Sequence, residues 1–355
     1  QGYGGLADTE HPTHAGEIGD WFLTTTNMNH TKVLVEYASA VSAVSGQIWD
    51  IDGNCYLDWI LSFGCIVLGH SHPVVNAAAI EQIEKGHTQQ LPPVLQNDLA
   101  EKLVELIPCA EKTLFLKTGS DATTAAVRVA RLVTGRDKII RFFGHFHGYH
   151  EFTYIGGHPP ADQLTASPPY RESAGIPASM AELIIPVEYN NLEALEAAVA
   201  QHAHEAGTLL VEPVDYNCGC ITPADGFLEA TRELADRHDL LLFFDEVQSF
   251  AKASPGGAQQ DYGVTPDICT IGKSLGGGLP LSAILGRGDL MDQYAPTGPV
   301  AHSGTFNAPL VCILGGLAFV EQIQLPAFWK TIRGLGAQLY AGLEEIAAAS
   351  PVPGR

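Results

Sequence analysis

The sequence predicts an α/β domain built on a mostly parallel sheet that is sandwiched by helices. Segments with helical periodicity, such as residues 74–85, 95–106 and 122–132, alternate with short apolar runs. Continuous apolar strands separated by helices are typical of parallel sheets covered on both faces. We therefore expect a doubly wound sheet. Its strands are predicted at residues 113–117, 138–143, 181–186, 207–211, 240–244, 268–271 and 282–285.

Composition narrows the class of protein and its partners. The 355 residues include 19 Lys and Arg against 40 Asp and Glu, and the formal charge of -21 would repel nucleic acid and anionic lipid. The longest apolar stretches, such as residues 240–244, fall far short of the roughly 20 residues that span a bilayer. Seven cysteines without paired CxxC motifs favour reduced thiols. We expect a soluble, cytoplasmic protein with no nucleic-acid or membrane partner.

Two segments outside the main pattern are irregular. Residues 1–46 are polar and read as an N-terminal arm, followed by two short strands at 46–52 and 56–61. The stretch DIDGN at 50–54 predicts a tight turn between them, because Asp, Gly and Asn tolerate positive φ. Residues 156–178 are rich in Pro, Gly, Ser and Ala, which predicts a long loop.

A turn at Thr118-Gly119-Ser120-Asp121 joins a predicted strand to the helix at 122–132. Backbone N–H groups at such a helix start, with the Ser120 hydroxyl and the positive end of the helix dipole, form an anion site suited to phosphate. Ordinary N-capping by Ser or Asp is the competing interpretation.

Asp245 stands at the carboxyl end of the apolar strand at 240–244. Ligands of open α/β sheets bind at this edge, and a buried carboxylate there needs a cationic or donor partner. A protonated pyridine nitrogen is such a partner. A metal ligand and a structural helix cap are the alternatives.

Lys273 follows the predicted strand at 268–271 and precedes three consecutive glycines at 276–278. Glycines permit close backbone approach to a bound group, and a desolvated lysine loses its proton easily, as imine chemistry requires. A solvated surface lysine is the alternative, which the glycine run weakens.

These features recur in the order and spacing of a known family. Other stretches that carry the likeness are WDIDGN at 49–54, GHFHG at 144–148, FDEVQ at 244–248 and GKSLGGGLP at 272–280. The chain resembles class III aminotransferases of the pyridoxal 5′-phosphate (PLP)-dependent fold type I superfamily, including the glutamate-1-semialdehyde 2,1-aminomutases. The resemblance implies the PLP-dependent transferase fold type I, with the large PLP-binding domain at 47–310.

Residues 311–355 would begin a small C-terminal domain that looks truncated. The helical pattern at 327–349 is amphipathic, so a folded partner is expected, and few residues follow to supply one. The family's segment after Thr305 is also one residue shorter here, at 306–309.

The resemblance assigns roles to particular residues. Lys273 would form the imine with PLP, Asp245 would hold the pyridine nitrogen, and Phe146 would stack on the ring. Thr305 would reach the phosphate of a neighbouring subunit, which implies a homodimer with shared active sites. No metal is expected. The implied cofactor-binding set is Gly119, Ser120, Asp121, Phe146, His147, Glu212, Asn217, Asp245, Val247, Gln248, Lys273 and Thr305. His145 and His147 could tune the site or merely pack.

The implied reaction moves an amino group from an amino acid or amine to a keto acid. An intramolecular transfer of the glutamate-1-semialdehyde 2,1-aminomutase type is the alternative, with a racemase or epimerase, or an inactive scaffold, less favoured. The region at 16–30, where the aminomutases carry a carboxylate-binding arginine, contains none. Gln248 stands where ordinary class III aminotransferases carry glutamine, and its amide can donate to the ring's phenolic oxygen. The missing arginine argues against carrying over the aminomutase substrate, and Gln248 favours transamination.

Overall fold

The computed structural model describes residues 40–50, 52–88 and 94–350. Most of the predicted arm at 1–46, including the region at 16–30, lies outside these described residues. The chain divides into two compact units, one up to Pro73 and one from Val74 onward.

The first unit holds a three-stranded antiparallel sheet in the order β1-β2-β3. Its strands are β1 (Ala40–Val44), β2 (Gln47–Asp50) and β3 (Cys55–Leu57). Asp50 confirms the predicted turn, because its carboxylate accepts the N–H groups of Asp52 at 3.0 Å and Asn54 at 2.8 Å. The single turn α3 (Leu61–Gly64) follows and has left-handed backbone at its centre.

Strand β1 lies within the segment that the sequence predicts to be irregular, so that part of the prediction is wrong. Its sequence, AVSAV, contains only small apolar side chains and one serine. Such a strand gives little periodic hydrophobic signal, although its backbone pairs with β2.

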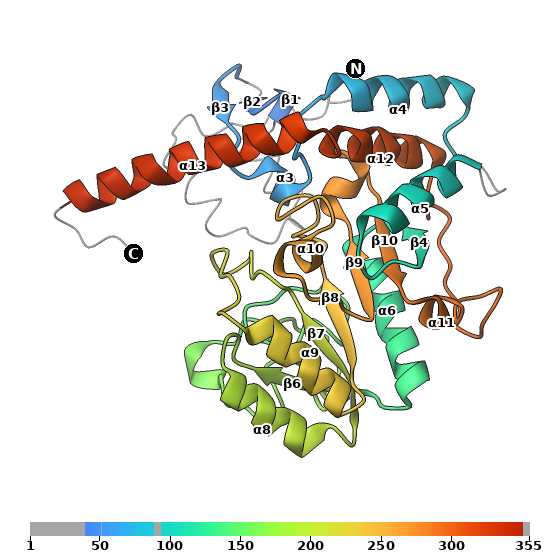
Figure 1. Ribbon diagram of the computed structural model, residues 1–355, viewed down its shortest axis with the longest axis vertical. Coiled ribbons are helices and arrows are strands. Elements are labelled where there is room, and N and C mark those ends of the chain that lie inside the picture. The colour runs from blue at the N-terminus through green and yellow to red at the C-terminus, as the bar shows by residue number, and fades with distance from the viewer. Residues whose placement is uncertain (1–39, 51, 89–93, 351–355) are drawn as a thin grey trace. The chain divides into compact units, whose positions relative to one another are not determined.

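The second unit is built on a seven-stranded sheet in the order β4-β10-β9-β8-β7-β5-β6. All neighbouring pairs among β5, β6, β7, β8 and β9 are parallel. Strand β10 is antiparallel to both of its neighbours, β4 and β9. All seven predicted runs form strands, which confirms a mostly parallel sheet (Figure 1). They are β4 (Lys112–Leu116), β5 (Lys138–Phe142), β6 (Ile184–Val187), β7 (Ala206–Val211), β8 (Leu241–Asp245), β9 (Ile268–Ile271) and β10 (Ser282–Gly286).

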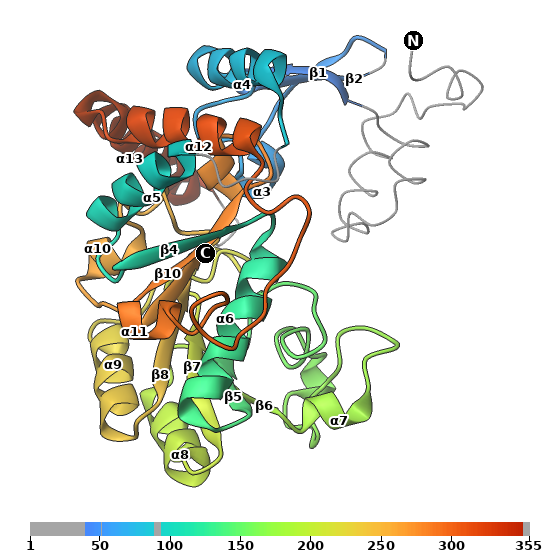
Figure 2. The ribbon, with the colours of Figure 1, turned by 90° about the vertical axis from the view of Figure 1, so that its right-hand side faces the viewer.

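Helices cover both faces of this sheet. Helix α6 (Gly119–Thr134) lies on one face, and α8 (Leu192–His202) and α9 (Phe227–Arg237) lie on the other (Figure 2). The buried face of α6 is made mostly of Ala and Val, so its backbone can approach the sheet closely. The remaining helices are α4 (Pro73–Lys85), α5 (Val94–Leu106), α7 (Ala178–Ala181), α10 (Ala258–Tyr262), α11 (Gly288–Met291), α12 (Leu310–Ile323) and α13 (Pro326–Ala349).

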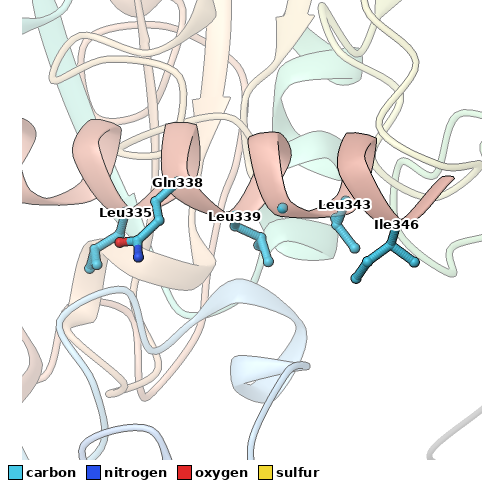
Figure 3. A pocket seen from close by; sticks show the side chains of 6 residues that line it. Leu335, Gln338, Leu339, Leu343 and Ile346 are labelled. Carbon is cyan, nitrogen blue, oxygen red and sulfur yellow. The ribbon is translucent and has the colours of Figure 1, made fainter. Parts of the chain in front are cut away.

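Helix α13 confirms the helical pattern predicted at 327–349 and contains no buried residue. Leu335, Leu339, Leu343 and Ile346 point to one side of it and form an apolar stripe (Figure 3). Leu335 is 59% exposed and Ile346 is 69% exposed. Among the described residues, no single helix is long and apolar enough to cross a membrane, and α12 and α13 meet that test only together, bent by 71°.

The predicted loop at 156–178 is also confirmed. Apart from the short 3₁₀ helix η1 (Ala161–Gln163), it is irregular until α7 begins. The start of the loop is bonded to the segment that follows β5, because the N–H of Gly144 donates to the carbonyl of Gly157 at 2.7 Å. The loop therefore begins beside that segment.

Candidate active site

The turn between β4 and α6 provides a helix N-terminus at the carboxyl edge of the sheet. Thr118 is the N-cap, and its hydroxyl accepts the N–H of Asp121 at 3.2 Å. A Cβ added to Gly119 would lie 2.9 Å from Cγ1 of Val247, so only glycine fits against that neighbour. Free N–H groups at this helix start, with the hydroxyl of Ser120, suit a phosphate.

The segment after β5 closes against the same turn. A Cβ added to Gly148 would lie 2.6 Å from Oγ of Ser120, and the backbone there has a left-handed φ of 93°. The N–H of Tyr149 donates to the same Ser120 hydroxyl at 3.3 Å. Glycine at 148 therefore allows two chain segments to meet beside the anion site.

Asp245 ends strand β8 and is only 3% exposed. Its Oδ1 accepts the N–H of Val247 and the hydroxyl of Thr270, both at 3.1 Å, and its Oδ2 lies 2.8 Å from Nδ1 of His147. Burial raises the pKa of Asp245 to about 6, although these hydrogen bonds and nearby Lys273 oppose the rise. A cation bound in the cavity would offset that cost of burial.

His147 is fully buried, and burial lowers its pKa well below the usual value, so the ring is neutral. When Asp245 is ionised, Nδ1 of His147 donates to it and Nε2 is an acceptor, which has no hydrogen-bond partner among the described residues. His145 has the opposite tautomer, because its Nδ1 accepts the N–H of Glu212 at 3.1 Å. Both histidines are therefore hydrogen-bonded to site elements, and neither merely packs.

Lys273 follows β9 and begins the 3₁₀ helix η2 (Lys273–Gly276). Its φ of 46° lies in the left-handed region, which is unfavourable for a residue with a side chain. Gly277 and Gly278 continue with φ of 62° and 106°. The strained lysine and its glycines bring the amine to the edge of the sheet that holds Asp245 and the helix start.

These elements enclose one cavity of about 180 Å³. Every residue of the predicted cofactor-binding set lines it except Asp121 and Thr305. Asp121 is instead paired with Nζ of Lys117 at 2.9 Å and with the Thr118 hydroxyl at 2.6 Å. The lining residues are Thr118, Gly119, Ser120, Phe146, His147, Gly148, Glu212, Asn217, Asp245, Val247, Gln248 and Lys273.

Thr118 and Gly148 were not in the predicted set. Both stand within motifs that the sequence displays, the turn at 118–121 and GHFHG at 144–148. Gly148 could have been predicted as a lining residue, since it directly follows Phe146 and His147, which are expected at the cofactor. That Thr305 reaches a neighbouring subunit stays a prediction.

The residues at the cavity fit a phosphorylated pyridine aldehyde. A phosphate suits the helix start at Gly119 and Ser120, a ring cation suits buried Asp245, and an aldehyde suits the amine of Lys273. Two polar atoms at the cavity have no partner among the described residues, Oε1 of Gln248 and Nε2 of His147. Unsatisfied buried atoms of this kind are expected where a ligand completes the site.

Comparisons with known proteins agree with this chemistry. A family model described as aminotransferase class-III matches residues 27–355. A glutamate-1-semialdehyde 2,1-aminomutase of Methanocaldococcus jannaschii is 41% identical over 81% of this chain, and the match spans 66% of that protein's length. An omega-transaminase from Sphaerobacter thermophilus has a TM-score of 0.83 and 31% identity, covering 90% of this chain and 74% of that one. A transaminase with PLP bound has a TM-score of 0.82 and 25% identity, and the match covers 88% of this chain and 73% of that one.

Proposed function

Since this chain belongs to the class-III aminotransferase family, we propose that it transfers an amino group from an amino acid or amine to a keto acid. The observation that carries the proposal is the convergence of Lys273, Asp245 and the helix start at Gly119 on one cavity. These are an amine, a buried acid and an anion site, which together match the three reactive parts of one cofactor.

The cofactor is pyridoxal 5′-phosphate. When bound, it supplies an aldehyde that takes up amines and a ring that withdraws electrons from the reacting carbon. The N–H groups at the start of α6 and the Ser120 hydroxyl would bind its phosphate. Phe146 and Val247 would hold the two ring faces, and Asp245 would keep a proton on the ring nitrogen.

Lys273 has two tasks in this scheme. Its Nζ would hold the cofactor covalently at rest. Once an incoming amine replaces Lys273 in that bond, the freed Nζ would take and return the proton of the substrate carbon. His147 and Thr270 keep the carboxylate of Asp245 in place, because each bonds one of its oxygens. The amide of Gln248 supplies a donor at the cavity wall, as is usual in transaminases.

A second candidate function is an intramolecular amino transfer. It is favoured by the 41% identity to a glutamate-1-semialdehyde 2,1-aminomutase, whose chemistry uses the same kind of site. Gln248, and the omega-transaminase likeness over 90% of this chain, favour transfer between two molecules. The two reactions differ in where the amino nitrogen ends.

The test is a screen of ¹⁵N-labelled amino acids and amines with unlabelled keto acids. Transfer between molecules predicts ¹⁵N in the amino acid formed from the keto acid. It also predicts that the cofactor extracted after incubation with donor alone has the mass of its aminated form. An aminomutase would rearrange glutamate-1-semialdehyde with the nitrogen kept in the product, and no label would reach the added keto acid.

We also propose that the protein works as a homodimer with shared sites in the cytoplasm, with small molecules as its reaction partners. The seven cysteines form no paired CxxC motifs, a pattern that suits reduced thiols in a reducing compartment. Thr305 would then face the phosphate site of the partner subunit. Sedimentation of the purified protein tests the dimer.

A further inference from the structure

One peptide group beside the cavity is held between two buried side chains, an arginine and a glutamate. The carbonyl of His145 accepts a hydrogen bond from Nη2 of Arg141. The N–H of Phe146, at the other end of the same peptide group, donates to Oε1 of Glu212 at 2.5 Å. Arg141 and Glu212 thus grip both ends of one peptide dipole, and we call this arrangement the Arg141–Glu212 clamp.

Arg141 comes from β5 and is only 1% exposed. Its Nη1 donates to the carbonyls of Thr153 and Ile155, so within the described residues all hydrogen bonds of Arg141's guanidinium go to the backbone of residues 145–155. A buried guanidinium is expensive to desolvate, and burial lowers its pKa while Glu172 and Glu212 oppose that shift. Its geometry indicates that it holds the segment after β5 in one conformation.

Glu212 follows β7, the neighbouring strand of β5, and is 3% exposed. The carboxylate of Glu212 also accepts a hydrogen bond from Nδ2 of Asn217 at 3.1 Å. The backbone N–H of Glu212 donates to Nδ1 of His145 at 3.1 Å. Burial raises its pKa well above the usual value. Side chain and backbone of Glu212 therefore both hold residues 145 and 146.

Gly157 packs against both Arg141 and His145, so closely that only glycine fits there. A Cβ there would lie 2.8 Å from Nη2 of Arg141 and 2.9 Å from the carbonyl oxygen of His145. The ring of Phe146, by contrast, is 38% exposed and lines the cavity, with an edge contact to Tyr154 at 6.0 Å between centroids. Its backbone is held more firmly than its ring is packed.

We infer that Arg141 and Glu212 are positioning residues that set Phe146 against the cofactor ring by clamping the peptide group between His145 and Phe146. This rests on the proposed function, which places a flat ring in the cavity. Family resemblance implies that Glu212 binds the cofactor itself. In the clamp it acts through Phe146, and the two roles predict different results in a double-mutant cycle.

The cycle combines Glu212→Ala with Phe146→Leu. The readout is the dissociation constant of the cofactor, measured from the fraction that purified holoenzyme retains on serial dilution. We expect Glu212→Ala to weaken binding about tenfold, the size of one lost hydrogen bond, and Phe146→Leu to weaken it by about as much through the lost aromatic contact. The double variant should bind within about twofold of Phe146→Leu alone, because Glu212 has no ring left to position.

Losses that multiply to about a hundredfold in the double variant would overturn the clamp, since Glu212 would then contribute independently of Phe146. Glu212→Gln is the matched control. Its amide oxygen can still accept the Phe146 N–H, so it should retain binding within about threefold. Loss in Glu212→Gln equal to that of Glu212→Ala would also contradict the clamp. The induced circular dichroism of the bound cofactor should change in Glu212→Ala and stay unchanged in Glu212→Gln.

If Glu212→Ala does not fold, Arg141→Lys is placed in the same two backgrounds. Lysine keeps the charge but cannot reach three carbonyls with a planar fork. The clamp predicts that Arg141→Lys weakens cofactor binding in the otherwise unaltered protein but causes no further loss in the Phe146→Leu variant. Equal losses in both proteins would reject the clamp. Failure of the proposed function is distinguishable, because the ¹⁵N screen measures amino transfer by the unaltered protein separately from cofactor binding.

Discussion

Nδ1 of His147 lies 2.8 Å from Oδ2 of Asp245, and the two side chains are 0% and 3% exposed. This contact joins the segment after β5 to the end of β8. It fixes the tautomer of the histidine and orients the carboxylate toward the cavity. The acid at the centre of the site is therefore held in place by its neighbours.

Replacing Asp245 by Asn should remove the charge that keeps a proton on the cofactor ring. We expect amino transfer, measured with the best donor of the screen, to fall at least about a hundredfold, as when an electrostatic group at a reacting centre is lost. The cofactor should remain attached at Lys273. Asp245→Glu, which keeps the charge, should retain more activity than Asn. Equal activity of Asp245→Asn and the unaltered protein would disprove the role of this carboxylate.

Replacing His147 by Leu removes a donor from the Asp245 carboxylate. The pKa of Asp245 should rise further, so the acid limb of the pH–rate profile should move to higher pH, with a loss of rate of about tenfold at neutral pH. His147→Asn, whose side-chain amide can donate from nearly the same position as Nδ1, should recover part of the rate. A profile that His147→Leu leaves in place would show that the contact has no influence on Asp245.

Gly119→Ala should push the helix start away from Val247, since the new Cβ would lie 2.9 Å from Cγ1. Overpacking of this kind costs about 1–3 kcal/mol, and the cofactor should bind about tenfold more weakly. The double variant Gly119→Ala with Val247→Ala should recover part of the affinity lost to the clash. Gly334→Ala, where nothing lies within 4 Å, is the control and should leave binding unchanged. Unaltered cofactor affinity in Gly119→Ala would rule out the close fit.

His150 should make stability depend on pH. Burial lowers its pKa from 6.5 to about 4, and its Nε2 lies 3.0 Å from the Thr123 hydroxyl and 3.1 Å from that of Thr153. Because the folded pKa is depressed, its contribution is fully present above pH 6.5 and is lost as pH falls toward 4.

The free energy of unfolding should therefore decrease less between pH 6.5 and 4 in His150→Gln than in the unaltered protein, by up to about 3 kcal/mol. Denaturant unfolding at several pH values measures the difference. Exposed His204→Gln is the control and should keep the slope of the parent. A slope in His150→Gln as steep as the parent's would contradict the buried, neutral state of this histidine.

The sequence predicted the sheet well because its strands are buried on both faces. Runs such as those at 240–244 and 268–271 are apolar throughout, which is a strong signal for central parallel strands. Strand β1 was missed, since its AVSAV sequence contains no large side chain. Hydrophobic patterning thus finds the apolar strands that build the core and overlooks a short strand without large side chains.

At the site, motifs placed the reactive groups but not the residues that support them. Lys273 and Asp245 stand at strand ends, where chain order alone predicts a ligand edge. Arg141 reads as the charged residue of a strand, and only the fold shows that it is buried against the backbone of residues 145–155. Asp121 lies in the predicted turn, yet its carboxylate pairs with Lys117 and does not line the cavity.

The most direct test of the account is borohydride reduction of the purified protein, followed by peptide mass spectrometry. We expect the mass of the reduced cofactor on the peptide that contains Lys273. Lys273→Ala should lose that label and the visible absorbance, while Lys85→Ala, an exposed lysine of α4, should keep both. Label on another lysine, or an unchanged spectrum in Lys273→Ala, would contradict the assignment of this site.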